Sequence, residues 1–320
     1  MLYFISRWER AITIRSARAK CPFFKHLSYD KLFNSGRLPR GAYIFSDLDR
    51  LSLFETELAS IIFRELQAAG MPVYNDPAQV LLRFDLLRAL AREGVNDYKV
   101  YRPQYGEWPE RYPVFLRRNT FHLGAQTEQL HSKEELETAM QQLLDAGIPH
   151  RNTMAVEYAA EGDANGLFRK YSVYRIGDRY FQDTTVNQKS WVVKSGEAGV
   201  AGDALYKAEF EAIHTVPFEA NVKRAFELGG IRYGRVDIGL YQGRPQVYEI
   251  NTNPTVSFST DHENAHRRKS RAVFVENYCA AIAELNVDLS GAPIELQHAA
   301  LNKRRRKYRW FQRLRSRPTY

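Results

Sequence analysis

The chain has 320 residues, 44% of them hydrophobic, and a net charge of +9, so it can bury a sizeable core divided between two or three lobes. Its two cysteines, Cys21 and Cys279, are far apart in sequence and supply neither a disulfide framework nor the spacing of a metal site, which favours a reducing, cytoplasmic setting. Charges at Arg7, Glu9 and Arg10 interrupt any signal-like apolar core, and no apolar run approaches the roughly 18 residues of a transmembrane segment.

The first third of the chain falls into two regions. Residues 1–40 are basic and irregular in pattern, and we expect them to form a basic N-terminal extension. Residues 41–102 alternate between strand-like and helix-like segments. The strand-like segments are 41–49, 72–76 and 98–102, and the helix-like segments are 51–69 and 77–92. This alternation is typical of a small parallel sheet, so we expect an N-terminal α/β lobe over residues 41–102.

The next elements contain candidate polar groups. An apolar strand is expected over residues 112–118, and it ends in two adjacent cations, Arg117 and Arg118. The following loop, residues 121–126, contains a single glycine, Gly124.

A helix is expected over residues 131–147, because Ser132 can cap its N-terminus and Glu135 follows three residues later, which is the pattern of a capping box. Residues 153–163 combine an apolar strand with an acidic loop. Any half-buried strand that leads into an acidic loop has this pattern, so the segment alone does not identify a site.

A basic hairpin is expected over residues 168–182, with Gly177 and Asp178 as its two-residue turn. Lys170 and Arg175 are five residues apart and therefore point to opposite faces of their strand. Only one of them can face a cleft, and the sequence does not indicate which. The alternative is a solvated edge strand whose charges prevent aggregation.

The segment 233–254 is the most informative part of the chain. Two strands with alternating apolar residues flank a turn that we expect at Gln242, Gly243 and Arg244. Because the register of a hairpin follows from its turn, a turn centred on Gly243 fixes which residues lie opposite each other.

With that register, Asp237 lies opposite Glu249 and Arg235 lies opposite Asn251, on one face of the hairpin. Two carboxylates at this distance repel each other unless a cation lies between them. Carboxylate and amide oxygens without His or Cys favour a hard ion, Mg²⁺ or Mn²⁺. The alternative is a solvated hairpin face with a structural Arg–Asp ion pair.

This hairpin resembles the C-terminal core of the ATP-grasp superfamily, whose members mostly join a carboxylic acid to an amine at the expense of ATP. In that family an R-x-D strand is followed, after a turn, by a strand with the pattern hydrophobic-E-hydrophobic-N-T-x-P. The resemblance implies an α/β (α+β) fold with an abbreviated N-terminal α/β lobe, a central lid lobe and a C-terminal mixed-sheet lobe, and the nucleotide bound between them. The ATP-grasp-like region would cover residues 103–297, and its cofactors would be ATP and Mg²⁺ or Mn²⁺.

The resemblance also implies roles for individual residues. The implied metal ligands are Asp237, Glu249 and Asn251. The implied catalytic cations are Arg235, Lys170 and Arg175. The implied nucleotide contacts are Arg117 at the phosphates, Glu157 and Tyr158 beside the adenine, and Glu161 or Asp163 at the ribose. The chain departs from the family in two places. It has Arg117 where a Lys is usual, and residues 121–126, in the place of the family's glycine-rich phosphate loop, contain only Gly124, which argues against a tight grip on the triphosphate.

The resulting hypothesis is an ADP-forming ligase that joins a carboxylate, small or peptidic, to an amine by way of an acyl-phosphate. The alternative is an ATP-binding module without ligase activity that orders a partner site, which the sparse phosphate loop favours. The sequence does not identify the acid or the amine.

A third hypothesis comes from the pattern H-E-x-x-H formed by His262, Glu263 and His266. On a helix this pattern places two His on one face around zinc, with the Glu as base, as in zinc hydrolases. A helix is expected over residues 264–285. The simpler interpretation is a polar helix start capped by Asp261.

The last region, residues 298–320, is a basic tail with nine Lys and Arg and no acidic residue. The rest of the chain has 37 basic and 37 acidic residues, so the tail accounts for the net charge. The tail is compatible with RNA, with anionic lipid or with an acidic partner, and the alternative is a solvated, frayed terminus.

Overall fold

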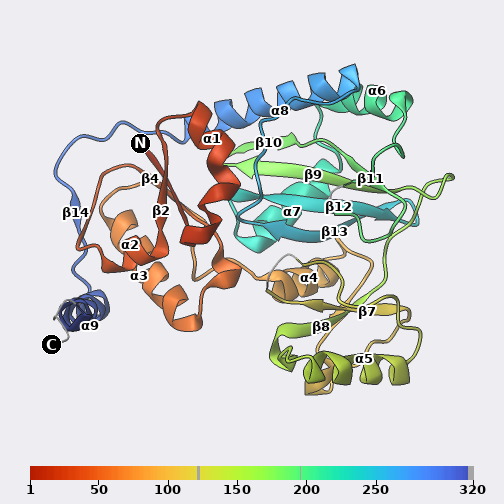
Figure 1. The fold of residues 1–320 in the computed structure, drawn as a ribbon, viewed down its shortest axis with the longest axis horizontal. Coiled ribbons are helices and arrows are strands. Elements are labelled where there is room, and N and C mark those ends of the chain that lie inside the picture. The colour runs from red at the N-terminus through yellow and green to blue at the C-terminus, as the bar shows by residue number, and fades with distance from the viewer. Residues whose placement is uncertain (121–122, 195, 316–320) are drawn as a thin grey trace.

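The computed structural model describes residues 1–120, 123–194 and 196–315, and within these ranges it describes the side chains up to residue 308. Figure 1 shows an elongated molecule with one lobe at the left and two stacked lobes at the right. Parallel and antiparallel sheets both occur, which confirms the predicted mixed α/β class. Four short 3-10 segments connect larger elements: η1 (Trp8–Ile14), η2 (Leu48–Arg50), η3 (Pro103–Tyr105) and η4 (His150–Asn152).

The N-terminal lobe is built on a parallel four-stranded sheet with the order β2-β1-β4-β5. Its strands are β1 (Leu2–Ser6), β2 (Phe24–Ser28), β4 (Ala42–Phe45) and β5 (Val73–Tyr74). Its helices are α1 (Arg15–Lys20), α2 (Tyr29–Asn34) and α3 (Leu53–Ala68). Helix α1 packs on one face of this sheet with Leu2 and Phe4, and α2 and α3 pack on the other face with Ile5 and Phe45, so both faces are covered.

The prediction that residues 1–40 form an extension is wrong. They contain β1, which is an interior strand of the sheet because it pairs with β2 on one side and with β4 on the other. Leu2 and Phe4 of β1 are fully buried and pack with Tyr233 of the C-terminal lobe. Because β1 has only five residues and is followed by a charged segment, its pattern was too short to read as a strand.

The central lobe contains an antiparallel sheet with the order β6-β8-β7, backed by α5 (Lys133–Asp145). Its strands are β6 (Val100–Tyr101), β7 (Val114–Arg118) and β8 (Thr153–Glu157). The expected third parallel strand at 98–102 is therefore wrong, because β6 pairs antiparallel with β8. Ser132 caps α5 as predicted, but the Glu135 carboxylate accepts from His131 N, so the capping box is incomplete.

The C-terminal lobe contains an antiparallel five-stranded sheet, in which β10-β9-β12-β13 are consecutive and β11 pairs with β9. The strands are β9 (Phe168–Ile176), β10 (Arg179–Gln182), β11 (Val186–Gln188), β12 (Tyr233–Tyr241) and β13 (Arg244–Asn251). The helices are α6 (Asp203–Ala212), α7 (Glu219–Gly229) and α8 (Ala265–Glu284). Tyr174 of β9 packs toward α8, and Val173 packs toward α7 and α4 (Arg83–Arg92), so helices cover both faces.

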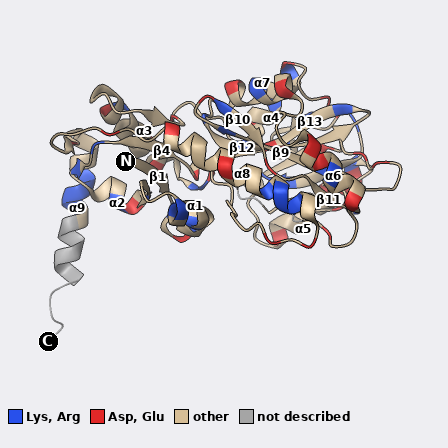
Figure 2. Ribbon diagram, turned by 90° about the horizontal axis from the view of Figure 1, so that it is seen from above, with Lys and Arg blue, Asp and Glu red and all other residues tan. Residues whose placement is uncertain are grey.

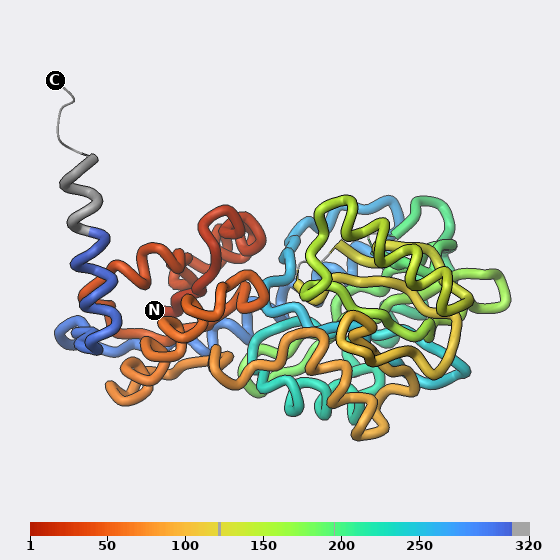
Figure 3. The backbone as a smooth tube through the Cα atoms, turned by 90° about the horizontal axis from the view of Figure 1, so that it is seen from below, coloured from red at the N-terminus to blue at the C-terminus, as the bar shows by residue number. Residues whose placement is uncertain are grey.

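The C-terminal segment returns to the N-terminal lobe. Strand β14 (Ile294–Glu295) pairs with β3 (Arg37–Leu38), and α9 (Ala299–Arg315) packs against α2. Leu301 is fully buried in the core of that lobe. Figure 3 shows both chain ends in this lobe, with α9 projecting from it. The basic tail therefore begins as a packed element, while residues 316–320 lie outside the described residues.

Two further sequence expectations concern cysteines and membrane segments. Cys21 and Cys279 are free but adjacent, although 258 positions separate them in sequence, and burial together with the neighbouring thiol raises the pKa of Cys21 to about 12. Within the described ranges, none of the helices combines the length and apolar character that crossing a bilayer requires.

Candidate active site

Strands β12 and β13 form the predicted hairpin, but with a different turn. The loop has two residues, Gln242 and Gly243, whose φ angles of 52° and 72° are both left-handed. Tyr241 pairs directly with Arg244, so the prediction that Arg244 belongs to the turn is wrong. Two left-handed residues give a turn whose twist matches that of the flanking strands.

A β-bulge nevertheless produces the predicted register. The ladder shifts by one residue beyond Asp237, so Asp237 pairs with Glu249 and Arg235 pairs with Asn251, which confirms both predicted pairs. Tyr248 is the extra residue of the bulged strand. Without this residue an even-numbered loop would place the two acids on opposite faces.

The packing around Tyr248 supports the bulge. Its hydroxyl donates to the backbone carbonyl of Ala159 at 3.0 Å. The ring lies against Gly239 of β12, where a Cβ atom would lie 2.2 Å from the Tyr248 hydroxyl oxygen. Gly239 is therefore required for this arrangement because no side chain fits there.

Asp237 is buried and surrounded by positive groups. Arg235 donates to Asp237 with Nε at 2.8 Å from Oδ1 and with a terminal nitrogen at 3.1 Å from Oδ2. The Ser172 hydroxyl donates at 2.9 Å, and Lys170 Nζ lies 3.3 Å from Oδ2. Burial alone would raise the pKa of Asp237, but Arg235 and Lys170 together lower it below its usual value.

Glu249 is held by two arginines. Arg117 donates to Glu249 Oε2 at 2.7 Å, and Arg83, at the start of α4, donates to the same oxygen at 2.5 Å. Arg83 also donates to the carbonyls of Arg118 and Asn119, at 2.7 and 3.2 Å. Burial and the neighbouring Arg83 lower the pKa of Arg117. Sequence reasoning missed Arg83, because nothing in a helical segment indicates a partner 166 residues away.

Lys170, and not Arg175, faces the two acids. Lys170 lines the cavity beside Asp237. The Arg175 guanidinium instead donates to the carbonyls of Gly177 and Ile231, at 3.1 and 3.0 Å, on the other face of β9. Of the two candidate catalytic cations on this strand, only Lys170 is brought to the acids.

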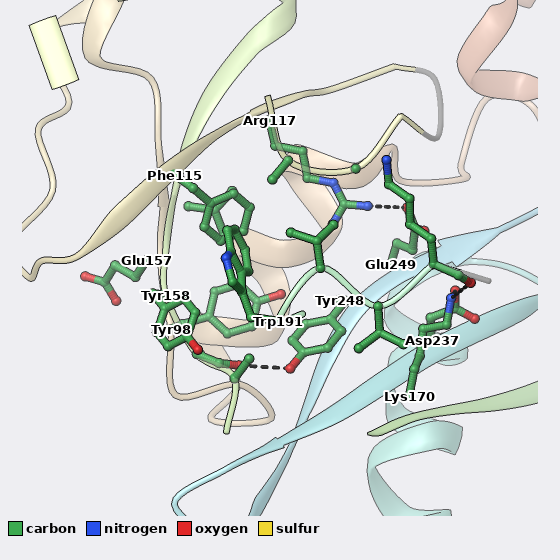
Figure 4. Close-up of a pocket in the computed structure, with 18 of the residues that line it drawn as sticks. Tyr98, Phe115, Arg117, Glu157, Tyr158, Lys170, Trp191, Asp237, Tyr248 and Glu249 are labelled. Atoms are coloured by element: carbon green, nitrogen blue, oxygen red, sulfur yellow. Dashed lines mark hydrogen bonds and ion pairs between the residues drawn. The ribbon is translucent and has the colours of Figure 1, made fainter. Parts of the chain in front are cut away.

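These side chains line a cavity of about 280 Å³ where β7 and β8 face β9, β12 and β13 (Figure 4). One end is aromatic and is lined by Tyr98, Phe115, Tyr158, Trp191 and Tyr248. The Trp191 ring packs edge-on against Phe115 at 4.9 Å and Tyr158 at 5.5 Å between centroids. Trp191 was also missed, because it lies in an irregular segment whose fold could not be predicted.

The other end of the cavity contains the phosphate-loop candidate and a further cation. Gly124 and Ala125 line the cavity, and Gly124 has a left-handed φ of 81°. A Cβ atom at Gly124 would lie 2.6 Å from Cε of Lys194, so the lysine lies directly against this loop. Lys194 also lines the cavity and was not a predicted site residue. Phe121 and His122 of the predicted loop lie outside the described residues.

Of the two candidate adenine contacts, Tyr158 belongs to the aromatic end of the cavity, whereas the Glu157 carboxylate has partners elsewhere. Glu157 is buried, and its carboxylate accepts from Lys99 N at 2.9 Å and from the Tyr101 hydroxyl at 2.8 Å. Figure 4 shows this carboxylate directed away from Glu249 and Asp237. Glu157 therefore lines the cavity, but its carboxylate is hydrogen-bonded to residues of the central lobe.

The two candidate ribose acids are not cavity-lining residues. The Glu161 carboxylate accepts from the backbone nitrogens of Gln242 and Gly243, at 2.6 and 2.9 Å, and thereby caps the hairpin turn. Asp163 accepts from Leu167 N at 3.1 Å and pairs with Arg169 at 2.8 Å. The same hydrogen bonds and Arg169 lower the pKa of Asp163.

The H-E-x-x-H pattern does not form a zinc motif. Helix α8 begins at Ala265 with Asn264 as its N-cap, so His262 and Glu263 precede the helix and cannot share a helical face with His266. His262 Nδ1 instead accepts from Asn264 N at 3.0 Å. Among the described residues, no three His, Cys, Asp or Glu side chains converge on a metal position. The zinc hydrolase hypothesis is therefore wrong.

The implied magnesium ligands have suitable chemistry. Asp237, Glu249 and Asn251 line one cavity, and their oxygens are hard donors. The repulsion between the two acids is nevertheless already offset by Arg235, Lys170, Arg83 and Arg117. The sequence argument that the acids require a metal ion to coexist is therefore wrong, although the donor set fits one.

Of the three comparisons with known proteins, the search of solved structures gave matches. No protein-family model matches the chain, and a search of curated proteins gave no match. A RimK-domain ATP-grasp protein from Sphaerobacter thermophilus is 16% identical, with 90% of this chain and 99% of that chain covered and a TM-score of 0.50. D-alanine–D-alanine ligase from Bacillus anthracis, in complex with ATP, is 13% identical, with 89% and 96% covered and a TM-score of 0.48.

At such low identity the first of these structures informs us about the fold and not about the reaction. It supports the mixed α/β architecture over nine-tenths of the chain. The chain therefore has the ATP-grasp fold, as its resemblance to that superfamily predicted.

Proposed function

We propose that the chain is an ADP-forming ligase that uses ATP to join a carboxylate to an amine. A carboxylate oxygen attacks the γ-phosphorus, the bond from that phosphorus to the β,γ-bridging oxygen breaks, and ADP leaves. The amine nitrogen then attacks the acyl carbon, the C–O bond to phosphate breaks, and the nitrogen loses a proton to give an amide. The observation that carries this proposal is one cavity with an aromatic end and an end lined by both acids and cations.

The charged end suits a transferring phosphoryl group. Arg235 and Lys170 are held beside Asp237, so their positive charge is already positioned where negative charge develops. Arg117 contributes a further buried cation. Lys194, which lies against the single-glycine loop, supplies a further positive charge at this end of the cavity. Preorganised charge of this kind is the main contribution of a protein to phosphoryl transfer.

The aromatic end suits a purine base. The Trp191 ring is in edge contact with both Phe115 and Tyr158, and the three rings offer flat apolar surfaces. A volume of about 280 Å³ is close to the lower end of the roughly 300–1,000 Å³ typical of small-molecule sites, so a nucleotide would fill the cavity. The carboxylate and amine substrates would then approach from its charged end.

Asp237, Glu249 and Asn251 would hold the metal ion. Magnesium, when bound, neutralises charge on the phosphates of the nucleotide. Binding requires the two carboxylates to exchange some of their contacts with Arg235, Lys170, Arg83 and Arg117 for the ion. The arginines and the lysine are then free to face phosphate oxygens.

A screen of carboxylates and amines for release of ADP and phosphate tests the proposal. We expect at least one pair to give release that depends on both substrates, with an amide product whose mass equals the two substrates minus water. Reactions that lack one substrate serve as controls. If ATP binds but no pair stimulates its turnover, the chain is instead an ATP-binding module that orders a partner site.

A further inference from the structure

The positive charge of the chain is concentrated in one lobe. The N-terminal lobe, defined as residues 1–76 and 286–320, has 20 Lys and Arg against 10 Asp and Glu. Residues 77–285, which contain the candidate active site, have 26 against 27. The basic tail is therefore not an isolated appendage, because it packs on a lobe that is itself basic.

Basic segments from both ends of the chain meet around β2, the edge strand of this lobe's sheet. Contacts run from α1 to β2, from β2 to α2 and from α2 to α9. Arg304 of α9 lies over the ring of Phe33 of α2, 5.0 Å from its centroid. Arg18 of α1 and Lys31 of α2 both act electrostatically on His26 of β2, so these two cations lie at the same sheet edge. Figure 2 shows basic residues on α1 and on α9.

We define the basic face by seven exposed cations of these four elements. They are Arg15, Arg18, Lys20, Lys25, Lys31, Lys303 and Arg306. None of them takes part in an ion pair among the described residues. Unpaired cations held close together repel each other, so an anionic partner that covers this face would relieve the repulsion.

We propose that the basic face binds the phosphodiester backbone of a nucleic acid. Among the described side chains, the exposed large hydrophobic residues at this face are Tyr308 on α9 and Trp8 and Ile12 on η1, which contacts α1 and β2. The cations outnumber them, and the charge of a phosphodiester backbone is complementary to such a surface. Exposed aromatic rings beside closely spaced cations also suit a single strand, whose bases can stack on the rings.

Fluorescence anisotropy with a labelled 20-nucleotide oligouridine tests the proposal on the full chain. We expect binding at 50 mM KCl that weakens steeply toward 200 mM. Each phosphate contact on a single strand contributes about −0.7 to the slope of log affinity against log salt, so four to six contacts predict a slope of roughly −3 to −4. An unlabelled 20-base-pair DNA duplex should compete, because the contacts are to the backbone.

Three double variants with the same net charge show where binding occurs. Lys303→Glu/Arg306→Glu changes α9, and Arg18→Glu/Lys31→Glu changes α1 and α2. Each should weaken binding by about tenfold or more at 100 mM KCl. The control Arg151→Glu/Lys207→Glu changes exposed cations of the other lobes and should alter affinity less than about twofold. Circular dichroism checks the fold, and Gln replaces Glu in any variant that fails to fold.

Several results would overturn the inference. The control variant could weaken binding as much as the others, which would indicate a net-charge effect. Arg18→Glu/Lys31→Glu could bind like the wild type, which would restrict binding to the tail. Tighter binding to phosphatidylserine vesicles or to polyglutamate than to RNA, or no RNA binding at 50 mM KCl, would also contradict it.

Discussion

Asp237 lies directly opposite Glu249 in the β12–β13 ladder, although the turn between the strands contains an even number of residues. The bulge at Tyr248 makes this possible, and Gly239 makes room for the Tyr248 ring. The pairing of the two acids therefore depends on a residue that contributes no side chain.

The first prediction concerns Gly239. Gly239→Ala places a Cβ atom 2.2 Å from the Tyr248 hydroxyl oxygen, so the ring or the strand must move. We expect the free energy of unfolding to fall by about 1–3 kcal/mol, as for an overpacked core, and nucleotide binding to weaken. Urea unfolding measures the first effect. The matched control is Gly36→Ala, where no atom lies within 4 Å of the added Cβ, and equal losses in both variants would contradict the account.

The second prediction separates two cations on β9. Lys170 lies 3.3 Å from Asp237, whereas Arg175 points to the other face and donates to backbone carbonyls. Lys170→Met should lower ATP turnover by about a hundredfold, the usual cost of removing a positioned donor. Arg175→Met should leave turnover within about threefold. A steady-state assay of ADP release by the two folded variants measures both rates. A larger loss in Arg175→Met than in Lys170→Met would show that the wrong cation has been assigned.

The third prediction concerns Arg83, which links Glu249 to the backbone that leads into the phosphate loop. The side chains of Arg83 and Glu249 are 5% and 14% exposed, so Arg83→Met leaves a largely buried carboxylate with fewer partners. We expect a loss of about 3–5 kcal/mol in the free energy of unfolding. On the same helix Arg88 pairs with Glu107 at 54% and 40% exposure, and Arg88→Met should cost under about 1 kcal/mol. Similar losses for the two variants would mean that Arg83 has no special role.

The fourth prediction is a pH dependence. The pKa of Asp237 in the folded chain lies below its ordinary value of 3.8, so the unfolded chain binds the proton more readily. The stability that ionised Asp237 contributes is thus fully present well above pH 3.8 and is lost as the pH falls through the lower, folded pKa. The Asp237→Asn variant has no carboxylate at this position and therefore lacks this pH-dependent contribution to stability. The stability difference between wild type and Asp237→Asn, measured by urea unfolding, should shrink below about pH 4, and a constant difference down to pH 2 would contradict the assigned shift.

The register of the site hairpin could be predicted because side-chain periodicity and the E-x-N pattern are local features, which can be recognised within a short stretch of sequence. It predicted the wrong turn, since a two-residue loop with a bulge and a three-residue loop give the same pairing of Asp237 with Glu249. The predicted and observed pairings therefore agree although the predicted turn is wrong, because a bulge cannot be recognised from the residue pattern of one strand.

Other features depend on long-range packing, which local patterns do not contain. Arg83 meets Glu249 only after α4 packs against the C-terminal sheet. Strand β1 was missed because its five residues form a strand by pairing with β2 and β4, and this pairing is not visible in the local sequence. Likewise, the buried position of Leu301 shows that the basic tail starts inside a core, which charge counting could not reveal.

The most direct test of the central claim is the rate of ADP release by wild type, Asp237→Asn and Glu249→Gln in the presence of Mg²⁺ and an active pair of substrates. Asp178→Asn, whose side chain is 87% exposed on the β9–β10 turn, is the matched control. The account predicts that the two site variants stay folded and lose about a hundredfold or more in rate, while the control keeps the wild-type rate. Turnover within twofold of wild type in both site variants would contradict it.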